Sequence, residues 1–380
     1  WSGWGLFAAA IGLGVLAKGP AILIHLLPAA LAAPLWMAGR APADGLKRWY
    51  AGLGLGVLGG AAIALLWALP AAIAGGDVYR NAIFWGQSAG RIVESFAHKR
   101  PIYWYVVLMP GLMLPLALWP GLWRALKPWR SLWADAGVRL CAIWVGGAFV
   151  LFSLISGKQL HYLLPEFPAV GLIAARALAA QPADPRPRGH LLPAVLVIVI
   201  GIGATLFSLG AIGHLPEEYK GHLDPIWGVV LASFGLAAAI IPVRAHIPRV
   251  ALLAVLAAVT VLTADLTARR LLREAFTLEP LARQLALWEH EGLPLANYGP
   301  YHGQYGFLGR LTKPVDIIGD KEVSDWVAAN PNGKIITYQE ETPDGDIQPD
   351  ITQPFRSHLI TVWDATEVKD NLALVKRPQG

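Results

Sequence analysis

The sequence of 380 residues contains few charged residues and almost no cysteine. Asp, Glu, Lys and Arg make up 15% of the chain, and Cys141 is its one cysteine. A single thiol excludes a disulfide framework, a thiolate zinc site and a CxxC redox pair within one chain. The low charge accompanies 55% hydrophobic residues and a mean hydropathy of +0.47, a composition typical of integral membrane proteins.

The net charge of +5 gives no support for nucleic-acid binding, because the two ends of the chain differ in sign. Residues 1–270 hold 21 Lys and Arg against 10 Asp and Glu, while residues 271–380 hold 10 against 16. We therefore predict a basic multi-span membrane region over 1–270 and a separate acidic, soluble domain over 271–380.

Apolar runs long enough to cross a bilayer, which takes about 20 residues, dominate the first region. The predicted spans are 2–17, 20–38, 49–74, 102–122, 139–156, 160–179, 191–213, 225–243 and 250–268. This pattern predicts a mainly α, polytopic membrane protein with about nine transmembrane helices. Because the chain begins at Trp1 inside an apolar run, we interpret it as the C-terminal part of a larger membrane domain.

The orientation of the spans follows from the Lys and Arg residues near their ends. One set of connections carries twelve of these residues and the opposite set carries seven, so the first set is predicted to be cytoplasmic. Four of the seven outer cations belong to the stretch 75–105. With nine spans, the residues after Arg270 are expected outside the cytoplasm.

The acidic tail is predicted to be a small α/β domain. A helical pattern over 277–292 has Thr277 as its expected N-cap and Gly292 as its stop, and a second helix is expected over 321–329. Strands are predicted at 293–299, 313–319, 333–339 and 357–363. The tail contains no zinc spacing, P-loop or dinucleotide motif. Its segment YGPYHGQYGFLGR fits a sugar-binding surface, but a packed turn is the favoured interpretation.

The stretch 75–105 is the longest polar island in the membrane region. Arg91, His98, Lys99 and Arg100 are donors suited to phosphate, and Glu94 is a candidate acid or base. The structural alternative is an amphipathic helix on the membrane surface, in which Glu94 is an ion-pair partner.

Two shorter polar turns are predicted on the same side of the membrane. Lys18 precedes a Gly-Pro pair between two spans, where a lysine can also simply extend toward lipid phosphates. Lys158, His161 and Tyr162 crowd into the turn SGKQLHY, although a plain hairpin needs only glycine and small polar residues. Ionisable groups at span ends are costly. Their convergence on one face favours a site for a lipid-borne phosphate or pyrophosphate.

The motifs GLGVLAKGP, HKRPIYWYVVLMPGLMLPLALWP and SGKQLHYLLPEFPAVGLIAARAL resemble bacterial membrane glycosyltransferases of the GT-C fold. Within that fold they are similar to the group of the lipid A aminoarabinose transferase and the protein O-mannosyltransferases (families 39 and 83). The resemblance covers about residues 1–180.

The resemblance implies an inner-membrane enzyme that takes a sugar from a polyprenyl-phosphate donor on the periplasmic side. It places the donor-phosphate and loop contacts at Lys18, Arg91, His98, Lys158 and Tyr162, with Arg100 and His161 as secondary candidates. It also implies an acidic residue acting at the acceptor from a first outer loop that this sequence lacks. The acceptor is left open among a lipid A-like glycolipid, another glycan and a protein. Direct displacement would invert the anomeric carbon.

Two functions of other classes remain as alternatives. A transporter or flippase of lipid-linked sugars needs polar groups near the middle of several spans, and these spans are almost free of ionisable residues. A non-catalytic assembly subunit would use the tail to bind a partner.

No cofactor is predicted with certainty. Asp77, Glu94, His98 and Glu166 are available as ligands for a divalent metal, but their spacing matches no metal motif.

Overall fold

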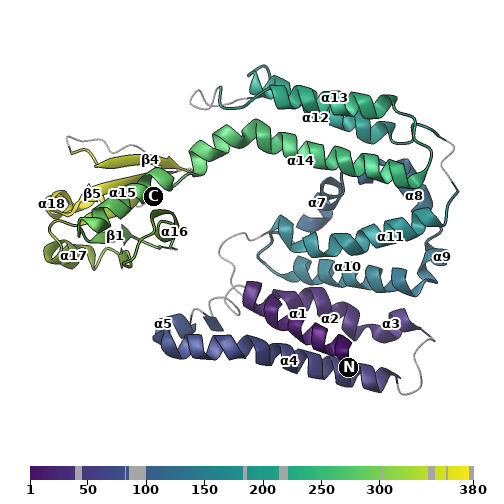
Figure 1. Ribbon diagram of the computed structural model, residues 1–380, viewed down its shortest axis with the longest axis horizontal. Coiled ribbons are helices and arrows are strands. Elements are labelled where there is room, and N and C mark those ends of the chain that lie inside the picture. Colours follow the sequence, from purple (N-terminus) through teal and green to yellow (C-terminus); the bar gives the residue numbers. More distant parts are fainter. Residues whose placement is uncertain are drawn as a thin grey trace. The chain divides into compact units, whose positions relative to one another are not determined.

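The computed structural model describes the chain in nine segments: 1–38, 45–81, 83–84, 100–182, 186–213, 221–301, 303–340, 347–356 and 358–375 (Figure 1). The chain forms two compact units. The first comprises Trp1–Val199 with Ser233–Thr260, and the second comprises Ile200–Ala232 with Val261–Gly380. The domain boundary expected near residue 270 remains a prediction.

Helices account for nearly all of the described membrane region. The helices up to residue 133 are α1 (Ser2–Lys18), α2 (Ile22–Leu31), α3 (Ala33–Met37), α4 (Gly45–Ala74), α5 (Gly76–Asn81), α7 (Trp104–Leu112), α8 (Pro120–Leu126) and α9 (Trp129–Trp133). They are followed by α10 (Ala136–Leu154), the 3₁₀ helix η4 (Leu160–Glu166), α11 (Phe167–Ala179), α12 (Leu191–Ser208), α13 (Ile226–Ile240) and α14 (His246–Phe276).

Within the described residues, six helical segments are long and apolar enough to cross a membrane, and α13 is a shorter apolar helix. The polytopic helical prediction is confirmed. The predicted span 102–122 differs, because it consists of the nine-residue α7, a 3₁₀ turn and the seven-residue α8. A nine-residue helix is about 14 Å long, roughly half the hydrocarbon thickness. Pro115 lies in the link between the two helices, and Pro120 opens α8 at its first residue, where proline needs no amide hydrogen bond.

Small residues allow α1 and α4 to pack closely. A methyl group added at Gly52, Gly56 or Gly60 of α4 would collide with Trp4, Phe7 or Ile11 of α1, respectively. Glycines spaced four apart line one helix face, and such a stripe is a common surface for helix association in membranes. The contacts advance in the same direction along both helices, so α1 and α4 are parallel and end on one face (Figure 1).

The helix α2 returns from that face antiparallel to α10. Three contacts show this direction: His25 lies against Phe152, Pro28 against Gly147, and the Trp36 carbonyl accepts from Arg139. The helix α11 then runs back along α10, and Arg176 pairs with Asp135 at the far end. The turn after Lys18, the end of α4 at Ala74 and the turn 155–162 therefore share one face, as the order of the predicted spans requires.

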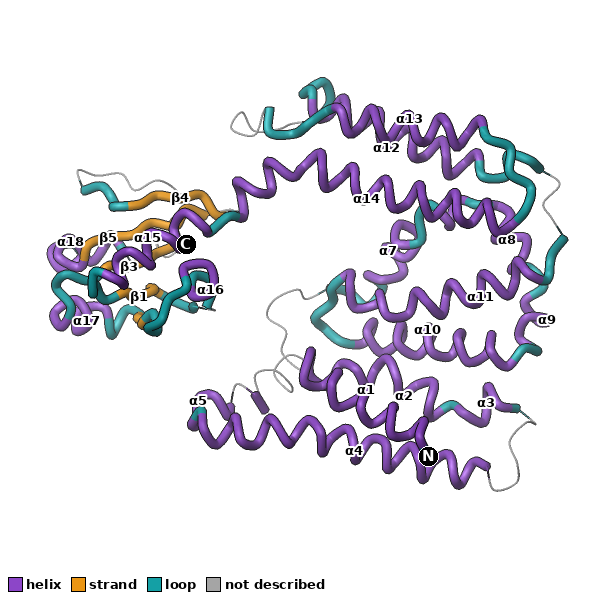
Figure 2. Tube along the Cα trace, viewed as in Figure 1, coloured by secondary structure: helices purple, strands orange, loops and turns teal. Residues whose placement is uncertain are grey.

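The tail is a five-stranded mixed sheet, in which Figure 2 shows the strands in orange. The strands are β1 (Leu295–Tyr298), β2 (Asp316–Ile318), β3 (Lys334–Gln339), β4 (Ile351–Phe355) and β5 (His358–Asp364), in the order β2-β1-β3-β5-β4. The strand β1 is parallel to both β2 and β3, while β5 is antiparallel to β3 and β4.

Alternating strand residues form a core on each face of this sheet. Ile336 packs in the core that contains Leu281 and Leu285 of α15 (Glu279–His290), whereas Ile335 packs in the opposite core with Val323 and Val327 of α17 (Val323–Ala329). The short helices α16 (Gly306–Gly309) and α18 (Ala365–Asp370) complete the domain. The α/β prediction for the tail is therefore confirmed.

Two local predictions for the tail were wrong. The strand β4 was missed because its sequence ITQPF contains Pro354, and proline argues against a central strand. β4 lies at the sheet edge, where proline is tolerated. The N-cap of α15 is Leu278 rather than Thr277, while Gly292 follows the helix with φ +86° as expected of a stop.

Candidate functional site

The outer-turn cluster consists of Lys18, His161 and Tyr162. Helix α1 ends here because Gly19 adopts φ +71° and Pro20 follows it, which leaves Lys18 at the helix terminus. The Lys18 Nζ atom donates to His161 Nε2 at 2.6 Å and lies 5.2 Å from the centre of the Tyr162 ring. Lys18 and His161 are exposed. An ammonium group is thus held at an accessible position by a histidine and an aromatic ring.

The turn after α10 presents its polar side chains on opposite sides. η4 is a 3₁₀ helix that contains Pro165 and leads into α11, which has a proline in its first turn. His161 is exposed on this turn, whereas Leu163 and Glu166 are buried. The turn therefore joins the outer-turn cluster to a buried layer beneath it.

Glu166 and His25 form the main polar contact of the buried layer. His25 Nδ1 lies 2.5 Å from Glu166 Oε1, and Glu166 is only 3% exposed. The second carboxylate oxygen, Oε2, is buried and has no hydrogen-bond partner among the described residues. The Phe152 ring contacts both this pair and the outer-turn cluster, with ring centroids 5.0 Å from His25 and 5.5 Å from Tyr162.

Lys158 also belongs to the buried layer. It is 3% exposed, and its Nζ donates to the carbonyl oxygens of Arg100 at 3.0 Å and Ile155 at 2.5 Å. The Arg100 amide in turn donates to the Ser156 carbonyl at 3.1 Å. Burial lowers the pKa of the Lys158 ammonium group below its ordinary value. Lys158 therefore fastens the segment that leads into α7 to the end of α10.

Tyr105 supports the same turn from below. It is fully buried, and its hydroxyl donates to the Gln159 carbonyl at 2.9 Å. Tyr105 packs in one core with Ala148, Phe152 and Leu163, and Tyr162 lies against that core. The backbone that carries Tyr162 is consequently held by packing and by a hydrogen bond.

No protein-family model and no curated protein sequence matches the chain. Two solved structures do. The crystal structure of ArnT from Cupriavidus metallidurans bound to undecaprenyl phosphate has a TM-score of 0.61 and 18% identity, over 94% of this chain and 68% of that one. The apo structure of the same protein has a TM-score of 0.62 and 19% identity, over 98% of this chain and 69% of that one. The chain has the GT-C fold.

The GT-C fold brings together three of the residues that the sequence singled out, Lys18, His161 and Tyr162, and a fourth, Lys158, lies three residues before His161. It gives them different environments, because Lys158 turns into backbone carbonyls while Lys18 reaches the surface.

Other predicted residues do not join the outer-turn cluster or are not described. Arg100 is exposed, and its described contacts with Lys158 and Ser156 are made by its backbone. Arg91, Glu94, His98 and Lys99 lie outside the described residues.

The residues considered for a metal are engaged elsewhere or not described. Asp77 pairs with Arg80 at 2.9 Å, and Glu166 pairs with His25. Over the described ranges, no group of three or more His, Cys, Asp or Glu side chains is arranged to hold a metal ion.

His25 and Tyr105 were missed by sequence reasoning. His25 is the one histidine in the apolar run AILIHLLPAA, and an ionisable residue inside a membrane helix marks a functional or paired position. His25 could therefore have been found from the sequence. Tyr105 could not, since an aromatic residue at the start of a span is ordinary in membrane proteins.

Proposed function

We propose that this protein is a glycosyltransferase that takes a sugar from a polyprenyl-phosphate donor at the outer-turn cluster. The observation that carries the proposal is the exposed Lys18 ammonium group, which is held 2.6 Å from His161 Nε2 and over the Tyr162 ring. Such a cation attracts a phosphate at the membrane surface. The bound undecaprenyl phosphate of the ArnT structure, which has the same fold, supports a donor of this class.

An apolar groove beside this cluster suits the polyprenyl chain. The groove has a volume of about 720 Å³, and it is lined by Leu23, Leu27 and Leu31 of α2 with Ile143 and Val150 of α10, together with other apolar residues and glycines. Leu23 lies five residues after Lys18, so the groove begins close to the proposed phosphate site. A lipid tail placed there would be stabilised by burial at about 25 cal/mol per Å².

The chemistry assigned to the outer-turn cluster is stabilisation of the leaving phosphate. Cleavage of the sugar to phosphate bond increases the negative charge on the phosphate oxygens, and a fixed cation stabilises that charge more in the transition state than in the ground state. Lys18 would supply the cation and Tyr162 a hydroxyl donor. Attack by the acceptor from the opposite side of the sugar would invert the anomeric carbon.

We place this reaction on the periplasmic face of a bacterial inner membrane, with the sheet domain on the same side. The excess of Lys and Arg on the opposite set of connections supports this orientation. The acceptor is a hydroxyl of a glycolipid such as lipid A, of another glycan or of a protein.

Binding of polyprenyl phosphate by the full chain in nanodiscs tests the proposal. Lys18→Ala should weaken binding ten- to a hundredfold, because a hydrogen bond to a charged group contributes about 1.5–3 kcal/mol. Sugar transfer from the loaded lipid should fall by about 100-fold or more.

Lys47→Ala is the matched control, since Lys47 is an exposed lysine in the first turn of α4, at the opposite membrane face. It should bind and transfer like the wild type. Unchanged lipid affinity in Lys18→Ala would exclude the proposed site.

A further inference from the structure

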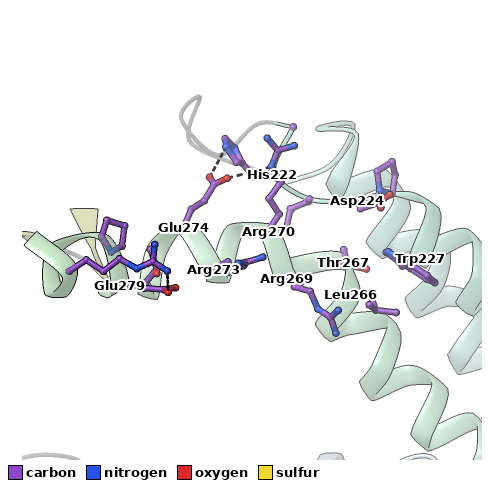
Figure 3. Close-up of a pocket in the computed structure, with 16 residues that line it drawn as sticks. His222, Asp224, Trp227, Leu266, Thr267, Arg269, Arg270, Arg273, Glu274 and Glu279 are labelled. Atoms are coloured by element: carbon purple, nitrogen blue, oxygen red, sulfur yellow. Dashed lines mark hydrogen bonds and ion pairs between the residues drawn. The ribbon is translucent and has the colours of Figure 1, made fainter. Parts of the chain in front are cut away.

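A second cationic site lies in the other unit, at the end of α14. Here a cavity of about 870 Å³ is lined by four arginines, Arg269, Arg270 and Arg273 of α14 and Arg283 of α15, and by residues of the turn before α13. Figure 3 shows Arg269, Arg270 and Arg273 on α14, with His222 and Asp224 on the facing turn. Ligand sites typically have volumes of about 300–1,000 Å³, so the cavity suits a lipid headgroup.

The sequence places this cavity at the level of lipid headgroups. Helix α14 carries no charged residue from Val250 to Ala264 and becomes charged from Asp265 onward, which marks the end of its membrane-spanning part. Trp227 lines the cavity from the first turn of α13, and tryptophan is enriched at the boundary between membrane and water. Arginines at this depth face the phosphates of the bilayer.

The arginines are available to a new anion. Arg269 pairs with Asp265, and Arg283 with Glu279, through single contacts between neighbouring turns, in which every partner is more than half exposed. Such exposed pairs are weak and exchange readily. Arg273 is exposed and makes no ion pair with any other residue that the structure describes.

The carboxylates around the cavity equal the arginines in number. Asp224, Glu274 and Glu279 line the cavity, and Asp265, outside the lining, pairs with Arg269. The Asp224 Oδ1 accepts from the amide of Ile226, the first residue of α13, at 3.1 Å. Glu274 is shared between Arg270 and His222, at 3.4 Å and 2.8 Å. Arg273 is therefore left without a carboxylate partner among the described residues, and a guanidinium group binds phosphate oxygens in a forked geometry.

We propose that this arginine cavity binds the phosphate group of an anionic membrane lipid. The site lies in a different unit from the outer-turn cluster, and the proposal does not depend on the proposed transfer reaction. Arg273 is the residue expected to contribute most, because its guanidinium group gives up no ion pair with a described residue when the phosphate binds.

Hydrogen–deuterium exchange of the full chain in detergent tests the proposal locally. Addition of dioleoylphosphatidic acid should slow exchange in peptides that cover residues 221–230 and 265–283, whereas dioleoylphosphatidylcholine should not. In Arg273→Gln the concentration of phosphatidic acid needed for half of this protection should rise at least tenfold. Since Arg273 makes no ion pair among the described residues, this substitution should leave the fold intact.

Lys321→Gln is the control, because Lys321 is an exposed cation of the same unit that does not line the cavity. It should respond like the wild type, and Arg273→Lys should retain part of the protection. Equal protection in wild type and Arg273→Gln would overturn the proposal. Protection by inorganic phosphate at the same concentration as the lipid would assign the site to a soluble phosphate and overturn the lipid assignment.

Discussion

The outer-turn cluster and the buried layer beneath it use similar residues for different purposes. Lys18 lies at the surface against His161 and Tyr162, whereas Lys158, a short distance below, is 3% exposed and donates to two backbone carbonyls. The motif pattern treats the two lysines alike. Lys158 stabilises the turn through its two carbonyl contacts, and Lys18 is the lysine that we propose binds phosphate.

This difference shows that a lysine in such a motif can either bind a ligand or stabilise the backbone. An accessible ammonium group can exchange water for a ligand. A buried one that already donates to carbonyls can do so only if those carbonyls lose their donor, and an unsatisfied buried carbonyl costs about 1–3 kcal/mol. The predictions below separate these two roles.

The largest effect is expected for Lys158→Met, which should destabilise the protein by about 2–4 kcal/mol. The substitution removes the donor for the Arg100 and Ile155 carbonyls and releases the segment that enters α7. Thermal unfolding of the full chain in detergent, followed by intrinsic fluorescence, measures the loss.

Lys18→Ala is the comparison, and it should unfold at the wild-type temperature because Lys18 is exposed. If Lys158→Met unfolded like the wild type but lost donor binding, the buried lysine would have to reach the phosphate, and the two layers would share one role.

The next largest loss of stability is expected at the contact between His25 and Glu166 beneath the outer-turn cluster. Glu166→Ala should destabilise the chain by about 3 kcal/mol, since it leaves the partly buried His25 without this partner. Glu166→Gln should cost less, because its amide oxygen can still accept from the histidine. A double-mutant cycle with His25→Ala should give a coupling of about 1–3 kcal/mol. Additive effects of the two single variants would show that the pair does not hold the turn.

A smaller effect is expected at Lys334, a buried lysine of the sheet domain whose partners are carboxylates. Burial alone would lower its pKa, but hydrogen bonds from its Nζ to Asp350 at 2.5 Å and Asp364 at 2.8 Å raise it above the ordinary 10.5. Lys334→Met should weaken β3 by about 2 kcal/mol, less than for a fully buried pair, because the aspartates are about one third exposed.

Hydrogen exchange of β3 peptides in the full chain measures this loss at two pH values. A raised folded pKa means that Lys334 contributes its full stability below pH 10.5 and loses it as the pH rises through the higher folded value. The gap between wild type and variant should therefore be complete at pH 8 and shrink only in strong alkali. A gap that was already smaller at pH 8 than at pH 6 would contradict the assignment.

The smallest effect is expected for Tyr162→Phe. The ring contacts with Phe152, His161 and Lys18 are kept, so stability should change by less than about 0.5 kcal/mol. Loss of the hydroxyl should weaken polyprenyl phosphate binding about tenfold, in line with one hydrogen bond to a charged group. Wild-type affinity would remove Tyr162 from the phosphate site and leave it as packing.

The membrane topology was largely predictable because it depends on composition. Apolar length identified the helical runs, and their alternation across the membrane placed the Lys18 turn and the SGKQLHY turn on one face, where the hydrogen bond from Lys18 to His161 joins them. The run 102–122 was wrongly predicted as one span, because hydropathy alone does not show that the helix ends before Pro115 and that a new one begins at Pro120.

The depth of each side chain within the cluster was not predictable. Lys158 and His161 are three residues apart, and one is buried while the other is exposed, because η4 is a 3₁₀ helix that starts only at Leu160. The contact between His25 and Glu166 joins residues 141 positions apart, and no local pattern encodes it. Packing between α2, α10 and η4 decides both features.

The glycine stripe of α4 has a consequence for how the chain enters the membrane. Because α1 and α4 are parallel neighbours, the chain between them must cross the membrane in the opposite direction during synthesis before the two helices can meet. Deletion of α2 and α3 would invert α4 and separate the two halves of this contact. Assembly of the Lys18 turn therefore depends on the return crossing that α2 begins.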